Sequence, residues 1–460
     1  MTSPSEQFAR ELLAIDAASL TDEDLAQVER LLYDYSVVAY GGSALPWVQK
    51  LHRWAERSAP KGAAQIIGSP ARAPADVAAH LNGAAAHSYE LDDVHGMSLT
   101  HPGSVVNSAA LAVAQDRAGA LAPGELAAAI VAGYEAMGRL GRAAGAAPLM
   151  GHGFHPTALL GPFGASVAAG KLLGHGVDEL LVGWGHALSA CSGSTQFSQD
   201  ARGTDIKRLH AGLAARNGVQ AAQMADVGLG APYEAITGRY GFLALYAAAE
   251  PELDELERSV TGQRIINRSR LKPYASCGLL HATVDALAIA LADLEVTAEA
   301  IESIRIGVQQ KAIDQHMERR PVSAMSAQYS LPFVVGATLT AGAWDYSVYD
   351  RLEGPAYDEI LAYGDRVEVY LNEEFERDFP TRGGSEVEVR LVDGTTRSAT
   401  VRDSLGSLSV PMSVGQLRRK GDGLIGDVDP DFDLDQLTTA VRAAAVDSDT
   451  EQLAAVLARA

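Results

Sequence analysis

Apolar residues recur at intervals of three and four through the first half of the chain, which is the spacing of buried and amphipathic helices. Leu25, Val28 and Leu32, for example, would share one helix face. Many other positions hold Ala or Gly, so we expect these helices to pack closely. The pattern predicts helices over residues 5–15, 22–38, 73–89, 104–117, 124–144, 156–173, 177–192 and 208–227.

The periodicity changes near residue 263. Val387, Val389 and Leu391 alternate with charged residues, as on a half-buried strand, and Asp393-Gly394 is a strong hairpin signal. Alternation of this kind predicts strands at 304–308, 366–371, 386–391 and 397–401. Further helices are expected between them, and helical spacing resumes from residue 413.

These patterns predict a multi-domain protein of the α and α+β classes. We expect a large all-α helical domain from residues 1–265 and 410–460, and a smaller α+β lid domain with an antiparallel sheet from residues 266–409. Strands and helices do not alternate through the first half, which excludes a Rossmann sheet or a TIM barrel there. A chain of 460 residues is long enough for more than one core.

Charge and cysteine content narrow the class of function. The chain carries 58 acidic and 37 basic residues, and this formal charge of −21 argues against nucleic acid or an anionic membrane as a partner. It has neither an apolar run of transmembrane length nor a signal-peptide core, so we expect a cytoplasmic protein. Cys191 and Cys277 lie outside any metal-binding spacing, and we expect no metal or iron–sulfur cluster.

Acidic residues and histidines gather between residues 90 and 101. Glu90, Asp92 and Asp93 end a predicted helix, and His95 and His101 lie in the loop that follows. Crowded carboxylates raise one another's pKa, and a histidine beside them can exchange protons near neutral pH. A solvated acidic turn with ordinary loop histidines is the alternative, and the local pattern favours neither.

A second histidine lies in Gly153-Phe154-His155-Pro156-Thr157, just before a helix of small residues. Pro156 suits the first turn of a helix, because a residue there has no intrahelical partner for its N–H. His155 is therefore predicted at a helix entrance, where free N–H groups and the helix dipole favour anions. On local grounds the alternative is a Gly/Pro turn with a core histidine.

Basic residues lie at the start of another predicted helix. Lys207, Arg208 and His210 lie in its first turn, where cations oppose the helix dipole. An anionic ligand is a physical reason to keep them there, and a solvated basic turn is the alternative.

The predicted domain boundary, a favoured place for ligand pockets, carries further candidates. Arg268 and Lys272 are followed by His281, and Tyr329 opens a later helix, where its hydroxyl can donate a proton. Cys277 lies between them and, taken alone, is expected to be buried filler rather than a nucleophile.

Together these segments resemble the 2-methylcitrate dehydratase / cis-aconitate decarboxylase family (MmgE/PrpD), which also includes iminodisuccinate epimerase. The resemblance covers about residues 10–420 and rests on the order and spacing of the pieces. The pieces are Asp92-Asp93, Thr100-His101-Pro102-Gly103, Gly153-Phe154-His155-Pro156-Thr157, Gly161-Pro162-Phe163-Gly164, Lys207-Arg208-Leu209-His210-Ala211-Gly212, Lys272-Pro273-Tyr274 with Cys277 and His281, and Ala327-Gln328-Tyr329-Ser330-Leu331-Pro332.

The resemblance implies a homodimer without a metal or organic cofactor, and an active site between the two domains for a small di- or tricarboxylate. On this basis the catalytic residues are expected to be Asp93, His101, His155, Lys207 and Tyr329. The residues expected to bind substrate are Lys272, His281, Arg268 and Arg208. In our hypothesis Lys207 and Lys272, with Arg268, clamp substrate carboxylates. One of His101 and His155 is an acid and the other a base, and Asp93 orients or tunes a histidine.

Three chemistries fit such a site: dehydration of a 2-methylcitrate-like hydroxy acid, decarboxylation of the cis-aconitate type, and epimerisation of the iminodisuccinate type. Each creates negative charge on a carbon beside a carboxylate, so each needs cations and acid/base groups. The loop from Asp93 to His101 is one residue longer than in the decarboxylase pattern, with Val94 where a threonine is common, which argues against decarboxylation.

We therefore expect a cofactor-independent hydro-lyase. A non-catalytic helical binding protein is the alternative from another class. The gathering of His, Lys and Asp on separate segments argues against it, because a scaffold has no reason to bring them into one pocket.

Overall fold

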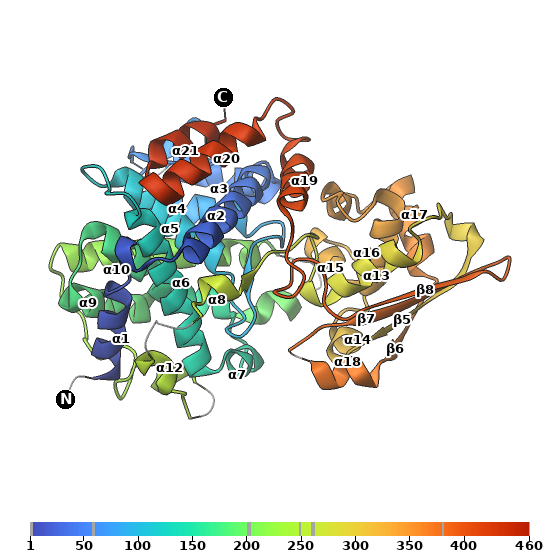
Figure 1. Cartoon of the computed structure of the whole chain (residues 1–460), viewed down its shortest axis with the longest axis horizontal. Coiled ribbons are helices and arrows are strands. Elements are labelled where there is room, and N and C mark those ends of the chain that lie inside the picture. The colour runs from blue at the N-terminus through green and yellow to red at the C-terminus, as the bar shows by residue number, and fades with distance from the viewer. Residues whose placement is uncertain are drawn as a thin grey trace.

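The computed structural model describes residues 3–57, 60–199, 204–247, 250–258, 263–379 and 381–459. Within these residues the molecule is mostly helical and has two parts (Figure 1). The larger part is a body of helices. The smaller part, at the right of the figure, combines helices with a four-stranded sheet.

The eight helices predicted in the first half are confirmed, with small shifts at their ends. They form because apolar faces recur at helical spacing and because several starts are capped; at the start of α2, the Thr21 side chain accepts from the Asp24 N–H and the Asp24 carboxylate accepts from the Thr21 N–H. The helices of this half are α1 Pro4–Leu13, α2 Asp22–Ser43, α3 Pro46–Glu56, α4 Ala75–Ala86, α5 Pro102–Asp116, α6 Glu125–Ala144, α7 Ala146–Gly151, α8 Pro156–Leu173, α9 Val177–Ala190, α10 Ile206–Asp226, α11 Phe242–Tyr246 and α12 Asp254–Glu257.

The core of the body is built from α4, α5, α6, α8 and α10, which pack on one another through small residues. Helices α4 and α10 cross at two glycines. A Cβ on Gly212 would lie 2.1 Å from the His80 carbonyl oxygen, and one on Gly83 would lie 2.8 Å from the Gly212 Cα. This close crossing brings the C-terminal end of α4 beside the first turn of α10.

The sheet of the smaller part has the strand order β6-β5-β7-β8. Its strands are β5 Ile301–Val308, β6 Val367–Leu371, β7 Ser385–Leu391 and β8 Thr396–Val401. The helices around it are α13 His281–Ala290, α14 Gln310–Gln315, α15 Ala324–Gln328, α16 Leu331–Ala341, α17 Pro355–Gly364 and α18 Glu373–Asp378.

The predicted hairpin is confirmed, because β7 and β8 pair antiparallel around a turn in which Gly394 has a φ of 87°. The predicted antiparallel pairing holds for β5, β7 and β8 but not for β6. β5 and β6 pair in parallel, with Ile304 opposite Val367. Four helices separate these two strands in the chain, and such a long crossover lets the second strand run in the same direction as the first.

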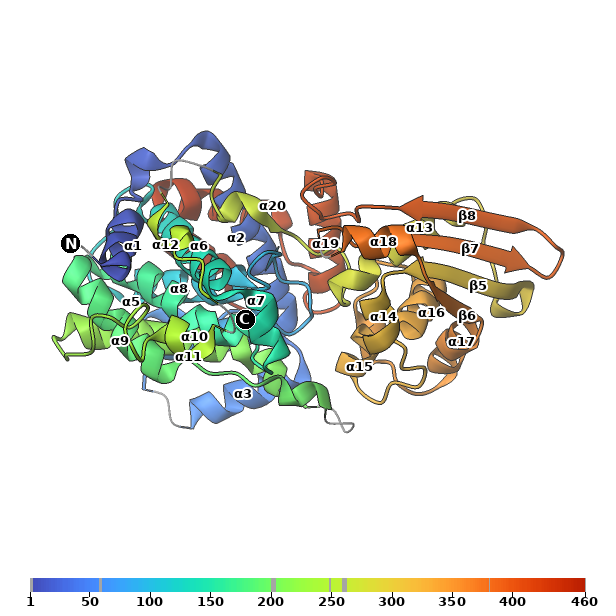
Figure 2. The same cartoon turned by 90° about the horizontal axis from the view of Figure 1, so that it is seen from below.

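The C-terminal helices return to the helical body (Figure 2). They are α19 Val414–Ile425, α20 Leu434–Arg442 and α21 Thr450–Leu457. Helix α19 lies where the two parts meet, and its fully buried Lys420 donates to Asp34 of α2 at 2.5 Å and to the Leu91 carbonyl at 2.8 Å. Among the described residues, none of the helices is both long and apolar enough to cross a membrane.

Candidate active site

One stretch, residues 87–101, links α4 to α5 and supplies residues to two clusters of side chains in the site. Its strand β3 (Val94–His95) pairs with β4 (Ser269–Arg270). Two residues of this stretch have left-handed backbone, Glu90 with a φ of 59° and Leu99 with a φ of 52°. A non-glycine residue held in this region carries strain of about 1–3 kcal/mol, and such strain concentrates at functional sites.

Two histidines occupy matching places at helix starts. His101 precedes Pro102 at the start of α5, and His155 precedes Pro156 at the start of α8. The His101 N–H donates to the Thr157 hydroxyl at 3.1 Å, which ties the two starts together. The predicted helix entrance at His155 is confirmed.

A buried carboxylate, Asp92, lies between two imidazoles. One oxygen is 2.6 Å from His87 Nδ1 and also accepts from the Ser104 hydroxyl at 2.8 Å, while the other is 3.2 Å from His101 Nδ1. Burial by itself would raise the pKa of Asp92, but the His101 and His87 rings hold it well below its ordinary value. Asp92 is therefore an ionised group that orients both rings.

The row of rings continues from His87 to His155 and His210. The His87 and His155 centroids lie 5.8 Å apart, and the Nδ1 atoms of His155 and His210 are 3.0 Å apart. Burial lowers the pKa of His87 to about 3 and that of His210 to about 4, and it lowers the pKa of His155 as well. We call His87, Asp92, His101, His155 and His210 the histidine cluster.

Among the described residues, Asp93 has no hydrogen bond or ion pair with a histidine, although the charge of His101 acts on its carboxylate. The expectation that Asp93 orients or tunes a histidine stays a prediction. Its carboxylate accepts from the Gly103 N–H at 2.7 Å and from the Tyr134 hydroxyl at 3.0 Å. Burial and the neighbouring charge of Asp92 raise the pKa of Asp93 to about 7. Consecutive side chains leave this irregular segment in different directions, and it is Asp92 that faces the rings.

A second cluster surrounds Glu90, whose side chain is buried. Lys207 forms an ion pair with one carboxylate oxygen. The other oxygen accepts from the Tyr329 hydroxyl at 3.2 Å and lies 3.6 Å from the Lys272 ammonium, which also donates to the Glu90 carbonyl at 2.8 Å. We call Glu90, Lys207, Lys272 and Tyr329 the lysine cluster. It joins the two parts of the molecule, because Lys272 and Tyr329 follow the crossing between them.

The lysine cluster concentrates positive charge away from water. Burial lowers the pKa of Lys207 and that of Lys272, and the positive charges of Lys272 and Arg208 add to the effect on Lys207. Each ammonium has three N–H donors, more than Glu90 alone can use. The cluster is therefore suited to bind a further carboxylate.

The other predicted substrate-binding residues lie around these clusters. Arg208 contacts the Ser88 carbonyl and stacks over Trp47 at 4.1 Å. His281 lies 3.2 Å from the Ser276 carbonyl and is buried. Arg268 ends the turn before β4 and, among the described residues, has no hydrogen bond or ion pair with either cluster.

Two members of the clusters carried only weak signals in the sequence. His87 lies at the end of an alanine-rich predicted helix, and no motif of the sequence includes it. Glu90 belongs to an acidic turn for which the sequence left a functional and a solvated interpretation open. The left-handed backbone of Glu90, which turns its side chain to the lysines, is visible only in the structure.

His87, Asp92 and His101 also meet the geometric minimum for holding a metal ion, with ligand atoms within 4.8 Å of one another. Imidazole and carboxylate suit zinc or a similar ion. In the arrangement described here, however, the carboxylate oxygens already face the Nδ1 atoms of both rings. The hydrogen bond to His87 and the close contact with His101 are therefore enough to explain the trio.

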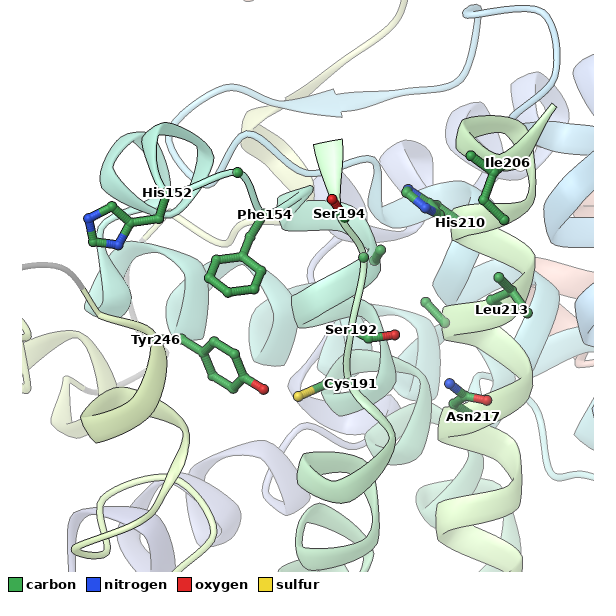
Figure 3. Close-up of a pocket in the computed structure, with 14 residues that line it drawn as sticks. His152, Phe154, Cys191, Ser192, Ser194, Ile206, His210, Leu213, Asn217 and Tyr246 are labelled. Carbon is green, nitrogen blue, oxygen red and sulfur yellow. The ribbon is translucent and has the colours of Figure 1, made fainter. Parts of the chain in front are cut away.

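A cavity of about 600 Å³ adjoins the histidine cluster (Figure 3). Helix α10 lines one side with Ile206, His210, Leu213 and Asn217. The opposite side carries Phe154 and Tyr246, with Cys191 and Ser192 between. His210 is the link, because it lines the cavity and also contacts His155.

Comparison with protein families identifies the family of the chain. The family model described as MmgE/PrpD N-terminal domain matches residues 6–254, and the one described as MmgE/PrpD C-terminal domain matches residues 274–441. The chain belongs to the MmgE/PrpD family. The resemblance noted in the sequence is thereby confirmed. The histidine cluster lies in the part matched by the N-terminal model, whereas Lys272 and Tyr329 of the lysine cluster lie after that part.

Several relatives within the MmgE/PrpD family are named cis-aconitate decarboxylase. The one from Aspergillus terreus is 27% identical over 445 residues, which cover 90% of this chain and 88% of the relative. The one from Mus musculus is 26% identical over 439 residues, which cover 91% of this chain and 86% of the relative. The one from Homo sapiens is 27% identical over 256 residues, 55% of this chain and 52% of the relative.

Proposed function

We propose that this protein is a carboxy-lyase that removes CO2 from a small unsaturated tricarboxylate of the cis-aconitate type. The observation that carries the proposal is the lysine cluster, where two buried ammonium groups with spare donors lie beside a row of imidazoles. The names of the relatives support this substrate class.

The chemistry follows from the charges. When CO2 leaves, the electron pair of the broken C–C bond stays on the substrate and spreads into a neighbouring unsaturated carboxylate. Lys207 and Lys272 hold that carboxylate and stabilise its growing charge, because a buried cation acts strongly in a site shielded from water. Glu90 keeps the two ammonium groups in place. The carbon then needs one proton, which acid/base groups of the site deliver.

A second candidate is dehydration of a 2-methylcitrate-like hydroxy acid. The longer loop between Asp93 and His101, with Val94 where a threonine is common, favours it. The same cations would hold the substrate, and an imidazole would protonate the leaving hydroxyl.

Purified protein incubated separately with cis-aconitate, 2-methylcitrate and iminodisuccinate decides between these reactions. We expect CO2 release from cis-aconitate, with a new product in the proton NMR spectrum. Loss of water from 2-methylcitrate without CO2 release would favour the second candidate, and loss of optical activity from iminodisuccinate would favour epimerisation. Lys207→Met is the matched inactive control.

We also propose that the protein works as a homodimer in the cytoplasm without a metal or organic cofactor, as the family resemblance implies. Light scattering on the purified protein tests the dimer. Activity after dialysis against EDTA tests for a metal, and the absorption spectrum of the purified protein tests for an organic cofactor that absorbs light.

A further inference from the structure

Cys277 lies within reach of a histidine that is locked in one orientation. Its sulfur is 3.7 Å from His316 Nε2. His316 Nδ1 lies 2.9 Å from the Tyr329 carbonyl oxygen, which can only accept, so Nδ1 carries a proton. Nε2 is therefore the ring atom that faces the sulfur and can take its proton. An activated cysteine has this arrangement, in which a thiol contacts a base and a third group orients that base.

This pair adjoins the lysine cluster. The Tyr329 carbonyl orients His316, and the Tyr329 hydroxyl donates to the Glu90 carboxylate. The centroids of the Tyr329 and His316 rings lie 5.7 Å apart. The Cys277 N–H donates to the Gln328 carbonyl at 2.9 Å, and Lys272 lies five residues earlier on the same segment. Cys277 is partly buried and packs against the core, so the expectation that it is filler stays a prediction, but its contact with His316 allows it a chemical role as well.

The charges around the sulfur favour its thiolate. Burial would raise the pKa of Cys277, but the contact with His316, and Lys272 nearby, bring it down to about 7. The same contact raises the pKa of His316. The titratable and charged groups that act on the sulfur are His316, Lys272, Arg270, Lys207 and Tyr329.

The other cysteine of the chain is a natural control. Cys191 is buried and donates to the Leu188 carbonyl at 3.2 Å. Burial raises the pKa of its thiol to about 11. The two thiols should therefore react at very different pH values.

We infer that Cys277 and His316 form a thiol–imidazole pair of the active site, and that Cys277 delivers the proton to the substrate carbon. The inference rests on the proposed decarboxylation. After CO2 has left, the S–H bond breaks, its proton forms the new C–H bond, and the electron pair stays on the sulfur. His316 returns a proton to the thiolate, and solvent returns one to His316, so each turnover consumes one proton and releases one CO2.

Alkylation by iodoacetamide tests the pair without any need for turnover. In Cys191→Ser protein Cys277 is the only thiol, and in Cys277→Ser protein Cys191 is the only one. We expect the alkylation rate of Cys277 to reach half its maximum near pH 7, and Cys191 to stay unlabelled in the folded protein at that pH. His316→Gln should move the Cys277 midpoint towards about 8.5. A midpoint near 8.5 that His316→Gln leaves unchanged would overturn the pair.

Protection and kinetics test its place in catalysis. Tricarballylate, a saturated tricarboxylate, should slow alkylation of Cys277 at least tenfold if substrate binds beside it. Cys277→Ser should lower kcat for cis-aconitate about 100-fold with KM within about threefold, and His316→Gln should lower kcat about tenfold. Both variants should lose the limb of the kcat–pH profile near pH 7. Circular dichroism checks that each variant is folded.

The outcomes separate this inference from the proposed function. Full turnover by Cys277→Ser and His316→Gln would overturn the catalytic role even if the thiol titrates near pH 7. If the unmodified protein decarboxylates none of the three acids, the proposed function fails. The thiol–imidazole pair would then be supported by the pH dependence of alkylation and by protection with tricarballylate. If tricarballylate does not protect Cys277, the pair does not lie in the active site.

Discussion

The two clusters of this site treat buried charge in opposite ways. In the histidine cluster one carboxylate, Asp92, faces two rings, and burial keeps the pKa of His87 down at about 3, so that ring is neutral. In the lysine cluster one carboxylate, Glu90, faces two ammonium groups and leaves a positive excess. The first arrangement is suited to proton transfer with little change in net charge. The second is suited to binding an anion.

One short segment supplies the carboxylates of both clusters. Glu90 and Asp92 are two residues apart, and the left-handed backbone at Glu90 turns them to different partners. The comparison teaches that the backbone of this turn, rather than residue type, decides which carboxylate faces the imidazoles and which faces the lysines. Changes on either side should therefore have different consequences.

The largest effect is expected from breaking the lysine cluster with Lys207→Met. The variant loses a cation that holds substrate and leaves the buried Glu90 short of a partner. We expect turnover of cis-aconitate, measured as CO2 release, to fall about 1000-fold or more. The free energy of unfolding, measured with urea, should fall by roughly 3 kcal/mol, because removing one partner leaves an uncompensated buried charge.

A double variant separates the two roles of Lys207. Lys207→Met with Glu90→Gln removes the uncompensated charge and should recover at least half of the lost stability. It should not recover turnover. Recovery of turnover in the double variant would show that Lys207 only neutralises Glu90 and does not hold substrate.

The next largest effect is expected from Asp92→Asn in the histidine cluster. The variant keeps the size of the side chain but loses the charge that orients His87 and His101. We expect kcat/KM to fall about 100-fold, as in other sites where an imidazole loses its carboxylate partner. The control is Asp93→Asn, which lies next in the chain and should cost less than tenfold. Equal losses in the two variants would contradict the assignment of Asp92.

The sequence predicted the helical part of the fold well because its signals are local. Pro156 marks a helix start, and apolar spacing marks the faces, so His155 was predicted at its place, whereas the helix after His101 begins two residues earlier than predicted. The parallel pairing of β5 and β6 was missed, since it depends on partners far apart in the chain. Alternation predicts a strand but not the direction of its neighbour.

The sequence predicted which types of residue form the site but not all of their contacts. Lys207, Lys272 and Tyr329 do meet in space, as the resemblance implied. Asp93 and not Asp92 was predicted as a site residue, because both are aspartates in one irregular turn and only the structure shows that Asp92 is the one that contacts the rings. The partner of Cys277 was invisible for the same reason, since His316 lies 39 residues away on another element.

A smaller effect is expected on stability from Asp93→Asn. Burial raises the pKa of Asp93 to about 7 in the folded protein, from 3.8 for the free side chain. The folded state therefore binds more protons than the unfolded state between these values, and Asp93 destabilises the protein progressively as pH rises through this window. The asparagine side chain has no charge to lose, so the variant should gain roughly 2 kcal/mol relative to the parent between pH 5 and pH 8.

Urea unfolding of both proteins at the two pH values measures this difference, and the other titrating groups cancel in the comparison. A difference that does not change with pH would mean that Asp93 is ionised throughout, as Asp92 is. The result therefore shows whether the two neighbouring carboxylates differ in charge as well as in direction.

The smallest effect is expected from Arg268→Ala, which tests the edge of the lysine cluster. Arg268 and Lys272 lie four residues apart and were both predicted to bind substrate, but only Lys272 contacts Glu90. Lys272→Ala should raise KM for cis-aconitate at least tenfold, whereas Arg268→Ala should change it less than twofold, because a charge without contact in the site is screened by water and salt. A tenfold rise in KM with Arg268→Ala would place its guanidinium on the substrate and extend the cluster along this segment towards β4.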